Sequence, residues 1–200
     1  MIALVDYGAG NLNSVRKGFV AAGAELMTPD SPLALDACAG IVVPGVGHFS
    51  STRVLGDDWR EAVADRVAAG VPLLGICLGM QWLFEGSDED RETSGMGLMS
   101  GRCARLSVQR PLKVPHVGWN ALDVRRESRI LEGIDAGTQM YFTHSFFAPV
   151  TDDCAASSEH GQAFAAAVER GHVAGVQFHP EKSGSAGIRI LRNFLTLTRR

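Results

Sequence analysis

The sequence predicts an α/β fold for residues 1–200, as one domain with a mostly parallel sheet flanked by helices and an additional antiparallel strand region. Short β-branched and aliphatic runs alternate with segments of helical periodicity through the first half, which is typical of βαβ units. A length of 200 residues suits a single hydrophobic core. The second half has consecutive strand patterns, which favour antiparallel pairing.

The first half is predicted to form strands and helices in alternation. Each predicted strand is a short apolar run, and each predicted helix carries apolar residues at helical spacing. Strands are expected at Ile2–Asp6, Gly40–Val43 and Val71–Ile76, and helices at Leu12–Ala22, Trp59–Ala69 and Met80–Phe84.

The second half begins with Glu85–Gly101, which is rich in Gly, Ser, Asp and Glu and lacks an apolar period, so an exposed loop is expected there. Strand patterns follow, and the last two favour a hairpin or ribbon. A final helix has apolar residues three and four positions apart, which indicates one buried face. The strand patterns cover Cys103 to about Arg125, Gln139–Val150, Gln162–Val168 and Val173–Phe178, and the helix covers Ser185–Leu197.

The composition is that of a folded globular chain, with 46% apolar and 20% charged residues. The net charge is −3, and basic residues are scattered apart from Arg125–Arg126 and Arg199–Arg200, so nucleic-acid binding is not expected. The amino terminus lacks the basic segment of a signal peptide, and no apolar stretch has the length of a membrane span. These features predict a cytoplasmic protein without a membrane partner.

Neither a metal ion nor an organic cofactor is expected. The loop Asp6–Asn11 contains Gly-x-Gly after the first strand, but Asn13 stands where a dinucleotide-binding fingerprint needs its third glycine, so a polar interaction loop is favoured. The cysteines are widely spaced without a Cys-x-x-Cys pair, which argues against zinc and disulfides and fits a reducing compartment. They are Cys38, Cys77, Cys103 and Cys154.

The strongest chemical signal is Cys77, at the corner between a predicted buried strand and a helix. Gly75 and Gly79 flank it two residues away on either side, which is typical of a nucleophile elbow. Glycine at these positions leaves room for a strained turn. An arbitrary cytosolic cysteine is usually a small buried hydrophobe, and this is the interpretation for the other cysteines. For Cys77 the glycines and the strand-to-helix context favour a nucleophile instead.

His179 is the candidate general base because it ends the predicted strand Val173–Phe178 and precedes Pro180 and Glu181. The carboxyl edge of a parallel sheet is where α/β enzymes bind ligands, so Cys77 and His179 are expected to converge there. Glu181 is expected to orient the imidazole. A lone histidine at a strand end is more often structural, but the elbow cysteine favours His179 over the other histidines. No His or Cys pair has metal-ligand spacing.

Acyl transfer needs two hydrogen-bond donors for the developing oxyanion. The amide of Leu78, which follows the nucleophile, is expected to supply one. The loop after the strand Gly40–Val43 is expected to supply the other, because Gly45 and Gly47 around Val46 allow a backbone amide to rotate into position. An ordinary strand-terminating turn is the alternative for this loop.

With these motifs in hand, the sequence resembles the class I, or triad, glutamine amidotransferases, and more narrowly the glutaminase subunits of imidazole glycerol phosphate synthases. The resemblance implies a flavodoxin-like fold and hydrolysis of L-glutamine to glutamate and ammonia through a glutamyl thioester on Cys77. His179 would take the thiol proton and return it to ammonia. The resemblance runs through most of the chain, on Asp6-Tyr7-Gly8-Ala9-Gly10-Asn11-Leu12, Pro44-Gly45-Val46-Gly47, Gly75-Ile76-Cys77-Leu78-Gly79-Met80-Gln81, Pro115-His116-Val117-Gly118-Trp119-Asn120, Tyr141-Phe142-Thr143-His144-Ser145 and Gln177-Phe178-His179-Pro180-Glu181-Lys182-Ser183.

The resemblance also implies which residues hold glutamine. They would be Gln81, Glu89 and the main chain at Ser145 and Phe146. Phe146 replaces a tyrosine often found there in the family, which matters little if only the backbone binds. For Glu89, in the predicted loop, a solvated acid is the alternative.

The resemblance finally implies a partner for the ammonia. In the family this is a (β/α)8-barrel cyclase, in a one-to-one heterodimer that makes imidazole glycerol phosphate and an aminoimidazole carboxamide ribotide in histidine biosynthesis. Four residues occupy positions that in the family face this cyclase, namely Asn11, Trp119, Tyr141 and Lys182. An exposed tryptophan suits an interface anchor, and core packing is the alternative for Trp119.

Other functions stay open from the sequence. They are an amidotransferase of the same superfamily that serves a different synthase, a cysteine peptidase or related hydrolase on a similar scaffold, and a silent docking module, which the intact triad argues against. The glutaminase activity is predicted to be low for the chain alone and to rise when an occupied cyclase binds.

Overall fold

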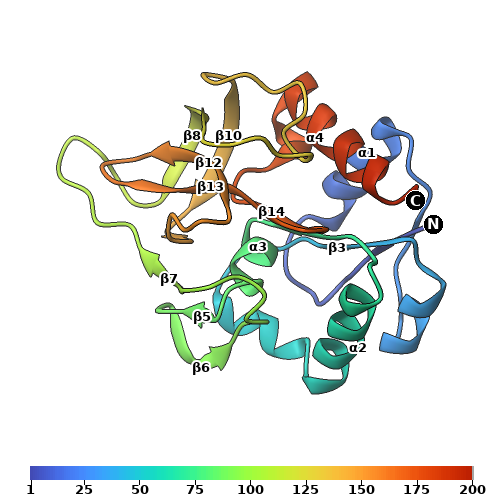
Figure 1. The fold of residues 1–200 in the computed structure, drawn as a ribbon. Helices are drawn as coiled ribbons and strands as arrows, with labels where there is room; N and C mark the ends of the chain where they lie inside the picture. Colours follow the sequence, from blue (N-terminus) through green and yellow to red (C-terminus); the bar gives the residue numbers. More distant parts are fainter. Residues whose placement is uncertain (200) are drawn as a thin grey trace.

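An eight-stranded sheet runs through the molecule in this computed structural model, which describes residues 1–199 (Figure 1). Its parallel part and its antiparallel part meet at β14. The parallel part consists, in spatial order, of β2 (Leu26–Met27), β1 (Ile2–Leu4), β3 (Gly40–Val43), β4 (Leu73–Ile76) and β14 (Val173–Val176). The antiparallel part continues with β13 (Ala163–Arg170), β12 (Cys154–Glu159) and β9 (Asp123–Val124).

Helices cover both faces of the parallel strands (Figure 1). Successive strand residues point to opposite faces, so Leu4 and Leu74 enter one core while Ala3 and Leu73 enter the other. The first core lies under α1 (Leu12–Ala22) and α4 (Gly184–Leu197), and the second lies under α2 (Asp57–Ala68) and α3 (Leu78–Trp82). Short 3-10 turns complete the layers as η1 (Pro32–Ala37), η2 (Phe49–Val54) and η3 (Pro180–Lys182).

The sequence dictates both ends of α1. Asn11 caps the start, because its Oδ1 accepts a hydrogen bond from the Ser14 amide at 3.1 Å. Gly23 ends the helix in the left-handed region, with φ of 97°. On the buried face of the helix, Phe19 meets Phe194 of α4 edge to face, with ring centroids 6.2 Å apart.

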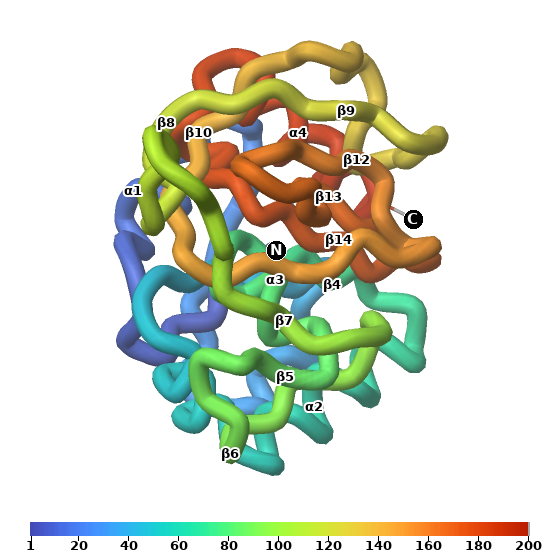
Figure 2. Tube along the Cα trace, turned by 90° about the vertical axis from the view of Figure 1, so that its left-hand side faces the viewer, coloured from blue at the N-terminus to red at the C-terminus, as the bar shows by residue number. Residues whose placement is uncertain are grey.

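Two smaller sheets lie beside the main one. The first pairs β8 (His116–Ala121) with β10 (Gln139–His144) in antiparallel fashion. The second joins β11 (Phe146–Phe147), β7 (Arg102–Arg105), β5 (Gly86–Ser87) and β6 (Asp90–Ser94) in that order. In Figure 2 the β5–β7 strands lie below α3, and β8 and β10 lie above it.

The predicted fold class is confirmed, including its antiparallel region. The predicted bounds of α1 and β3 match the structure, and the predicted late hairpin is the pair β13–β14. The prediction of an exposed loop over Glu85–Gly101 is wrong, because β5 and β6 lie there and Met99 is fully buried. Gly95 packs so closely that an added Cβ would lie 1.9 Å from the Phe84 carbonyl oxygen. Pairing of β5 with β6 and with β7 orders this polar segment.

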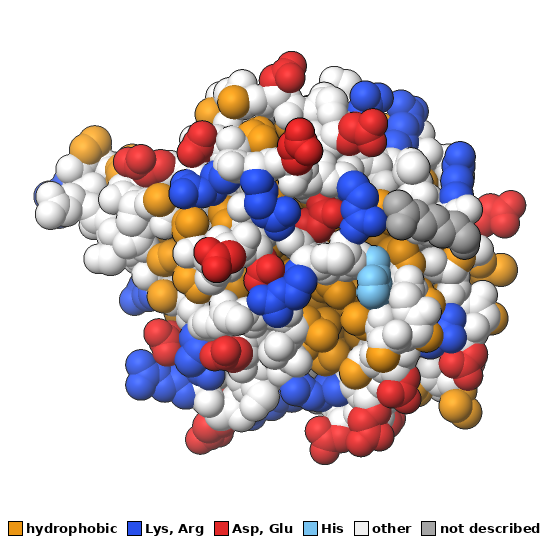
Figure 3. All heavy atoms as spheres, viewed as in Figure 1, with side chains coloured by type: hydrophobic (Ala, Val, Ile, Leu, Met, Phe, Trp, Pro, Cys, Tyr) orange, Lys and Arg blue, Asp and Glu red, His pale blue; other side chains and the backbone are white. Residues whose placement is uncertain are grey.

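Charges on the face drawn in Figure 3 are mixed, with acidic and basic side chains interspersed around apolar ones. Neither sign forms the continuous stripe that nucleic-acid binding proteins present, as far as this face shows. Among the helices of residues 1–199, none is both long and apolar enough to cross a membrane.

Candidate active site

Cys77 stands at a strained corner between β4 and α3. Its backbone has φ of 54° and ψ of −107°, and it is the one residue other than glycine with positive φ in the described range 1–199. A Cβ at Gly75 would lie 2.5 Å from the Gly79 carbonyl oxygen, and a Cβ at Gly79 would lie 1.7 Å from the Val43 carbonyl oxygen. The flanking glycines are therefore a steric requirement of the bend that presents the thiol.

His179 and Glu181 form a buried pair just beyond β14. His179 Nδ1 lies 2.8 Å from Glu181 Oε1, and the two side chains are 3% and 2% exposed. Because a carboxylate only accepts hydrogen bonds, Nδ1 carries the proton and Nε2 faces the other way. Within residues 1–199, Nε2 has no hydrogen-bond partner of normal geometry.

The parallel pairing of β4 and β14 brings Cys77 and His179 to the same edge of the sheet. Ile76 lies opposite Val176, and the Cys77 amide donates to the Val176 carbonyl at 2.7 Å. The thiol of Cys77 is close enough to His179 to affect the pKa of the imidazole. Burial alone would lower the pKa of His179, but interaction with Cys77 and with the Glu181 carboxylate outweighs it and raises the pKa to about 10.

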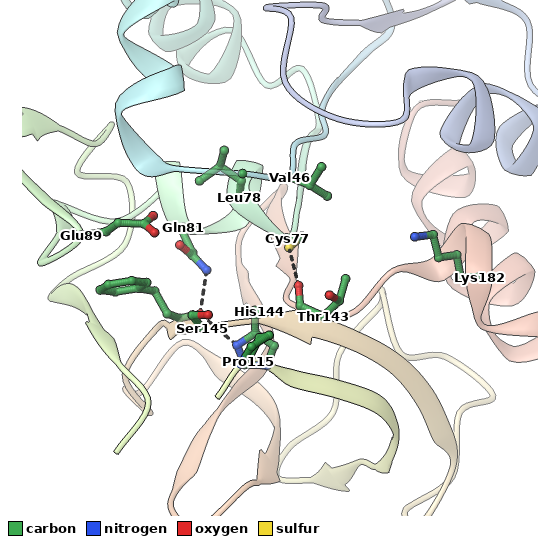
Figure 4. A pocket seen from close by; sticks show the side chains of 12 residues that line it. Val46, Cys77, Leu78, Gln81, Glu89, Pro115, Thr143, His144, Ser145 and Lys182 are labelled. Carbon is green, nitrogen blue, oxygen red and sulfur yellow. Dashed lines mark hydrogen bonds between the residues drawn. The ribbon is translucent and has the colours of Figure 1, made fainter. Parts of the chain in front are cut away.

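A cavity of about 360 Å³ opens in front of the Cys77 sulfur. Figure 4 shows Gln81 and Glu89 on one side of the sulfur and Lys182 on the other. Most of the residues predicted for the oxyanion and for glutamine therefore share one cavity with the candidate nucleophile. Its lining consists of Val46, Gly47, Cys77, Leu78, Gln81, Glu89, Pro115, Thr143, His144, Ser145, Phe146 and Lys182.

The candidate glutamine-binding side chains are fixed by hydrogen bonds. Gln81 Nε2 donates to the Phe146 carbonyl at 2.9 Å and to Gln177 Oε1 at 3.1 Å. Glu89 Oε2 accepts from the Phe49 amide at 2.8 Å. The alternative of a freely solvated acid at Glu89 is thus wrong, because the carboxylate is held at the cavity wall.

The loop of Gly45, Val46 and Gly47, which was predicted to supply an oxyanion donor, instead directs a carbonyl toward the Leu78 amide. The Leu78 amide, one of the predicted donors, donates to the Gly45 carbonyl at 3.2 Å. Gly45 is tightly enclosed, since an added Cβ would lie 1.9 Å from the Tyr7 hydroxyl oxygen. Gly47 has φ of 112°, which only glycine adopts readily. The structure therefore places Gly45, Val46 and Gly47 beside the thiol while the Leu78 amide is occupied.

The candidate partner-facing residues gather beside the cavity. Trp119 and Tyr141 lie opposite each other on β8 and β10, with ring centroids 6.0 Å apart, and Lys182 Nζ lies 5.6 Å from the Tyr141 centroid. Trp119 is 56% exposed, so the alternative of core packing is wrong. Asn11 is exposed at the start of α1.

Comparison with known proteins decides the family. The sequence matches the family described as glutamine amidotransferase class-I over residues 3–197. The chain belongs to the class I glutamine amidotransferase family. It is 46% identical to the imidazole glycerol phosphate synthase subunit HisH of Gloeobacter violaceus, over 97% of this chain and 88% of that protein. It is 47% identical to the subunit HisH of Natronomonas pharaonis, over 97% of this chain and 93% of that protein.

Solved structures show the same fold at lower identity. A crystal structure described as a glutamine amidotransferase superposes with a TM-score of 0.77 at 21% identity, covering 99% of both chains. The chain is thus a class I glutamine amidotransferase in sequence and in fold.

Several residues of this amidotransferase site were not predicted from its sequence. Gln177 Nε2 donates to the Cys77 sulfur at 3.5 Å, and the Thr143 carbonyl lies 3.9 Å from the same sulfur. The position of Gln177 two residues before His179, at the end of the predicted strand Val173–Phe178, was the available signal, because alternate residues of an extended chain point to the same side. Within the described residues, no three His, Cys, Asp or Glu side chains gather as a metal site would require.

Proposed function

We propose that this amidotransferase hydrolyses L-glutamine through a glutamyl thioester on Cys77 and delivers the ammonia to a cyclase subunit of an imidazole glycerol phosphate synthase. The observation that carries the proposal is the strained Cys77 thiol at the cavity wall beside the buried His179–Glu181 pair. A nucleophile, a base and a residue that orients the base form the minimal set for acyl transfer.

The proposed chemistry uses the two ring nitrogens of His179 differently: Nδ1 is bonded to Glu181, and Nε2 exchanges protons with the reacting groups. His179 Nε2 takes the thiol proton, and the sulfur attacks the carboxamide carbon of glutamine. When the C–N bond breaks, the same proton goes to the leaving ammonia and a thioester remains. Water then attacks the thioester with His179 as base, which releases glutamate and restores the thiol. A His179 pKa of about 10 keeps the proton on the ring at neutral pH until ammonia needs it.

The oxyanion donors are the part of the site that has to rearrange. The Leu78 amide is engaged by the Gly45 carbonyl, so it is not free for an oxyanion in this conformation. Rotation of the peptide between Gly45 and Val46 would withdraw the carbonyl and turn the Val46 amide toward the cavity. Both Leu78 and Val46 would then donate to the oxyanion. This requirement supports low activity in the isolated chain.

Recognition of glutamine is assigned to the cavity wall. Glu89 and Gln81 are held on one side of the thiol, and the main chain at Ser145 and Phe146 lies beside them. A carboxylate suits the α-amino group of glutamine, and backbone amides suit its α-carboxylate. The side chain of Phe146 is then free to differ from tyrosine.

The partner surface is assigned to Trp119, Tyr141 and Lys182, with Asn11 at its edge. The relatives HisH are named as subunits of a synthase, which supports a docked partner. An exposed tryptophan packed edge to face against a tyrosine is typical of an interface anchor. Lys182 both lines the cavity and contacts Tyr141, so docking would act directly on the site. We propose a one-to-one complex with a (β/α)8-barrel cyclase.

A glutaminase assay tests the proposal. Wild type and Cys77→Ala are compared with and without a purified cyclase and its nucleotide ligand, and glutamate release is measured. Wild type is expected to be slow alone and faster with the occupied cyclase, and Cys77→Ala is expected to be inactive in both. Equal turnover with and without the cyclase would contradict the partner assignment, and an active Cys77→Ala would contradict the nucleophile.

A further inference from the structure

A hydrogen-bonded row of side chains lies behind the cavity wall and ends at the main chain of Phe146. His144 Nδ1 lies 2.9 Å from the Phe146 carbonyl oxygen, and His144 Nε2 lies 3.1 Å from His116 Nδ1. His116 Nε2 in turn lies 3.4 Å from Asn120 Nδ2. His116 and His144 are directly opposite each other on β8 and β10, and both are buried.

The chemistry of the end group fixes the direction of the whole row. A carbonyl only accepts, so His144 Nδ1 must carry the hydrogen. In a neutral ring Nε2 is then an acceptor, so His116 Nδ1 must carry a hydrogen and donate it. His116 Nε2 is left to accept from the Asn120 amide. The order of donation is therefore Asn120 to His116 to His144 to Phe146.

Both rings remain neutral at physiological pH, as this order requires. Burial lowers the pKa of His144 to about 3, against an opposing effect of its bond to Phe146. Burial, together with the charge of His160, lowers the pKa of His116 to about 4. A protonated ring would have two donors and no acceptor, which would break the row.

Packing holds the rings in place. His116 stacks on Phe142 at a centroid distance of 5.1 Å and on His160 at 4.2 Å. His160 is itself fixed by a bond from Nε2 to the Lys113 carbonyl at 2.8 Å. Asn120 is anchored by a second bond, from Nδ2 to the Glu159 carbonyl at 2.8 Å.

The row ends at a residue whose backbone faces the cavity. In the antiparallel pairing of β11 with β7, the Leu106 amide donates to the Ser145 carbonyl at 2.8 Å. The next residue, Phe146, lies opposite Arg105, so its N–H and C=O both point away from β7. Its C=O is held by two donors, His144 Nδ1 and Gln81 Nε2. Its N–H is directed to the same side as its C=O, and Phe146 lines the cavity.

We propose that His144 is a positioning residue for glutamine. Its Nδ1–H holds the Phe146 main chain so that the amide meets the substrate, and His116 and Asn120 enforce the required tautomer. This inference rests on the proposed glutaminase function and adds residues to which that function assigns no role. The alternative is that the histidines only stabilise the β8–β10 pair.

The test compares two variants of the same histidine. His144→Asn retains an amide donor near the position of Nδ1, whereas His144→Phe keeps the bulk and loses the donor. Labelling of Cys77 is followed with a chloroketone analogue of L-glutamine, which needs the glutamine site, and with iodoacetamide, which does not. His144→Phe is expected to slow labelling by the chloroketone at least about fivefold, from the loss of one buried hydrogen bond. His144→Asn is expected to stay within about threefold of wild type, and iodoacetamide should label all three proteins alike.

A long-range ¹H–¹⁵N spectrum of the histidine rings in the wild type adds a readout independent of activity. His144 and His116 should both appear as neutral Nδ1–H tautomers at pH 7, with His172→Gln as a control that leaves them unchanged. An Nε2–H tautomer at His144, or equal labelling losses in Asn and Phe variants, would overturn this inference alone. Failure of the chloroketone to label wild type faster than iodoacetamide does would overturn the glutaminase proposal, and this inference with it.

Discussion

The parallel part of the sheet and the antiparallel strands around it contribute different kinds of residue to the candidate site. The parallel part supplies Cys77 and His179 from the ends of adjacent strands, where the backbone is fixed on both sides. The flanking strands supply Phe146 and Trp119 from the short antiparallel pairings β11–β7 and β10–β8. The groups proposed to react thus lie on the parallel part, which we expect to be the rigid layer. Phe146 and Trp119, which are proposed to contact substrate and partner, lie on the flanking layer, which we expect to be more adaptable.

The largest effect should come from the rigid layer. Cys77→Ala is expected to reduce glutamine turnover by more than about 10³-fold, because no other thiol reaches the cavity. Folding should be preserved, since alanine is small and meets the same backbone constraint. The matched control is Cys38→Ala, a buried cysteine far from the cavity, which should keep its turnover. Glutamate release under saturating glutamine measures the difference, and comparable losses in both variants would contradict a division of roles.

Two glycine variants test whether the layers differ in rigidity. Gly79→Ala places a Cβ 1.7 Å from the Val43 carbonyl oxygen, so we expect a loss of several kcal/mol or failure to fold. Gly137→Ala lies next to β10, with φ of 86° and open space around its Cβ. It should cost only about 1–2 kcal/mol, the penalty of the left-handed backbone. Denaturant unfolding of both variants measures this, and equal costs would contradict the contrast.

The same contrast explains how much the sequence could predict. The parallel layer has strong local signals, since apolar runs, the caps of α1 and the glycines around Cys77 agree with one another. The segment Glu85–Gly101 has none, because β5 and β6 are ordered by pairing with each other and, for β5, with β7, rather than by an apolar pattern of their own. The strand Cys154–Glu159 was likewise missed, since alanine and serine have little strand preference of their own.

In the site, the sequence could not predict how individual groups are oriented or which of them are hydrogen-bonded to each other. Glycines at 45 and 47 indicate a loop that can turn, but they do not say that the Gly45 carbonyl faces the Leu78 amide. His116 and His144 are distant in sequence, and only the register of β8 with β10 reveals that they share a hydrogen bond. Local residue types therefore predicted most of the groups that line the cavity, and tertiary pairing decided how they are oriented.

An intermediate effect is expected in the acid stability of the flanking strands. His144 and His116 have folded pKa values of about 3 and about 4, against about 6.5 when unfolded. Above pH 6.5 both states are neutral, and pH has no effect through these rings. Below pH 6.5 the two histidines bind protons in the unfolded chain but not in the folded chain, so the free energy of unfolding falls as the pH drops.

Thermal unfolding between pH 6.5 and about 5 measures this, because most carboxylates do not yet titrate there. His144→Asn removes one of the two rings, so its melting temperature should decline less steeply with falling pH than that of wild type. His172→Gln, at the other end of β14, serves as the control for loss of a histidine. Identical slopes in wild type and His144→Asn would contradict a buried neutral pair.

The smallest effect on the chain itself is expected at its most exposed aromatic residue. Trp119 is 56% exposed, so Trp119→Ala should change the free energy of unfolding by no more than about 0.5 kcal/mol. Affinity for the cyclase should nevertheless fall, by roughly 2 kcal/mol or about 30-fold, as for an interface anchor. Val54→Ala is the matched control, because Val54 is 65% exposed and lies on η2, away from the Trp119–Tyr141 pair. A calorimetric titration with the purified cyclase separates the two variants. If Trp119→Ala bound the cyclase as tightly as Val54→Ala and wild type do, the assignment of docking to the flanking layer would be contradicted. The partner would then have to bind the parallel layer instead.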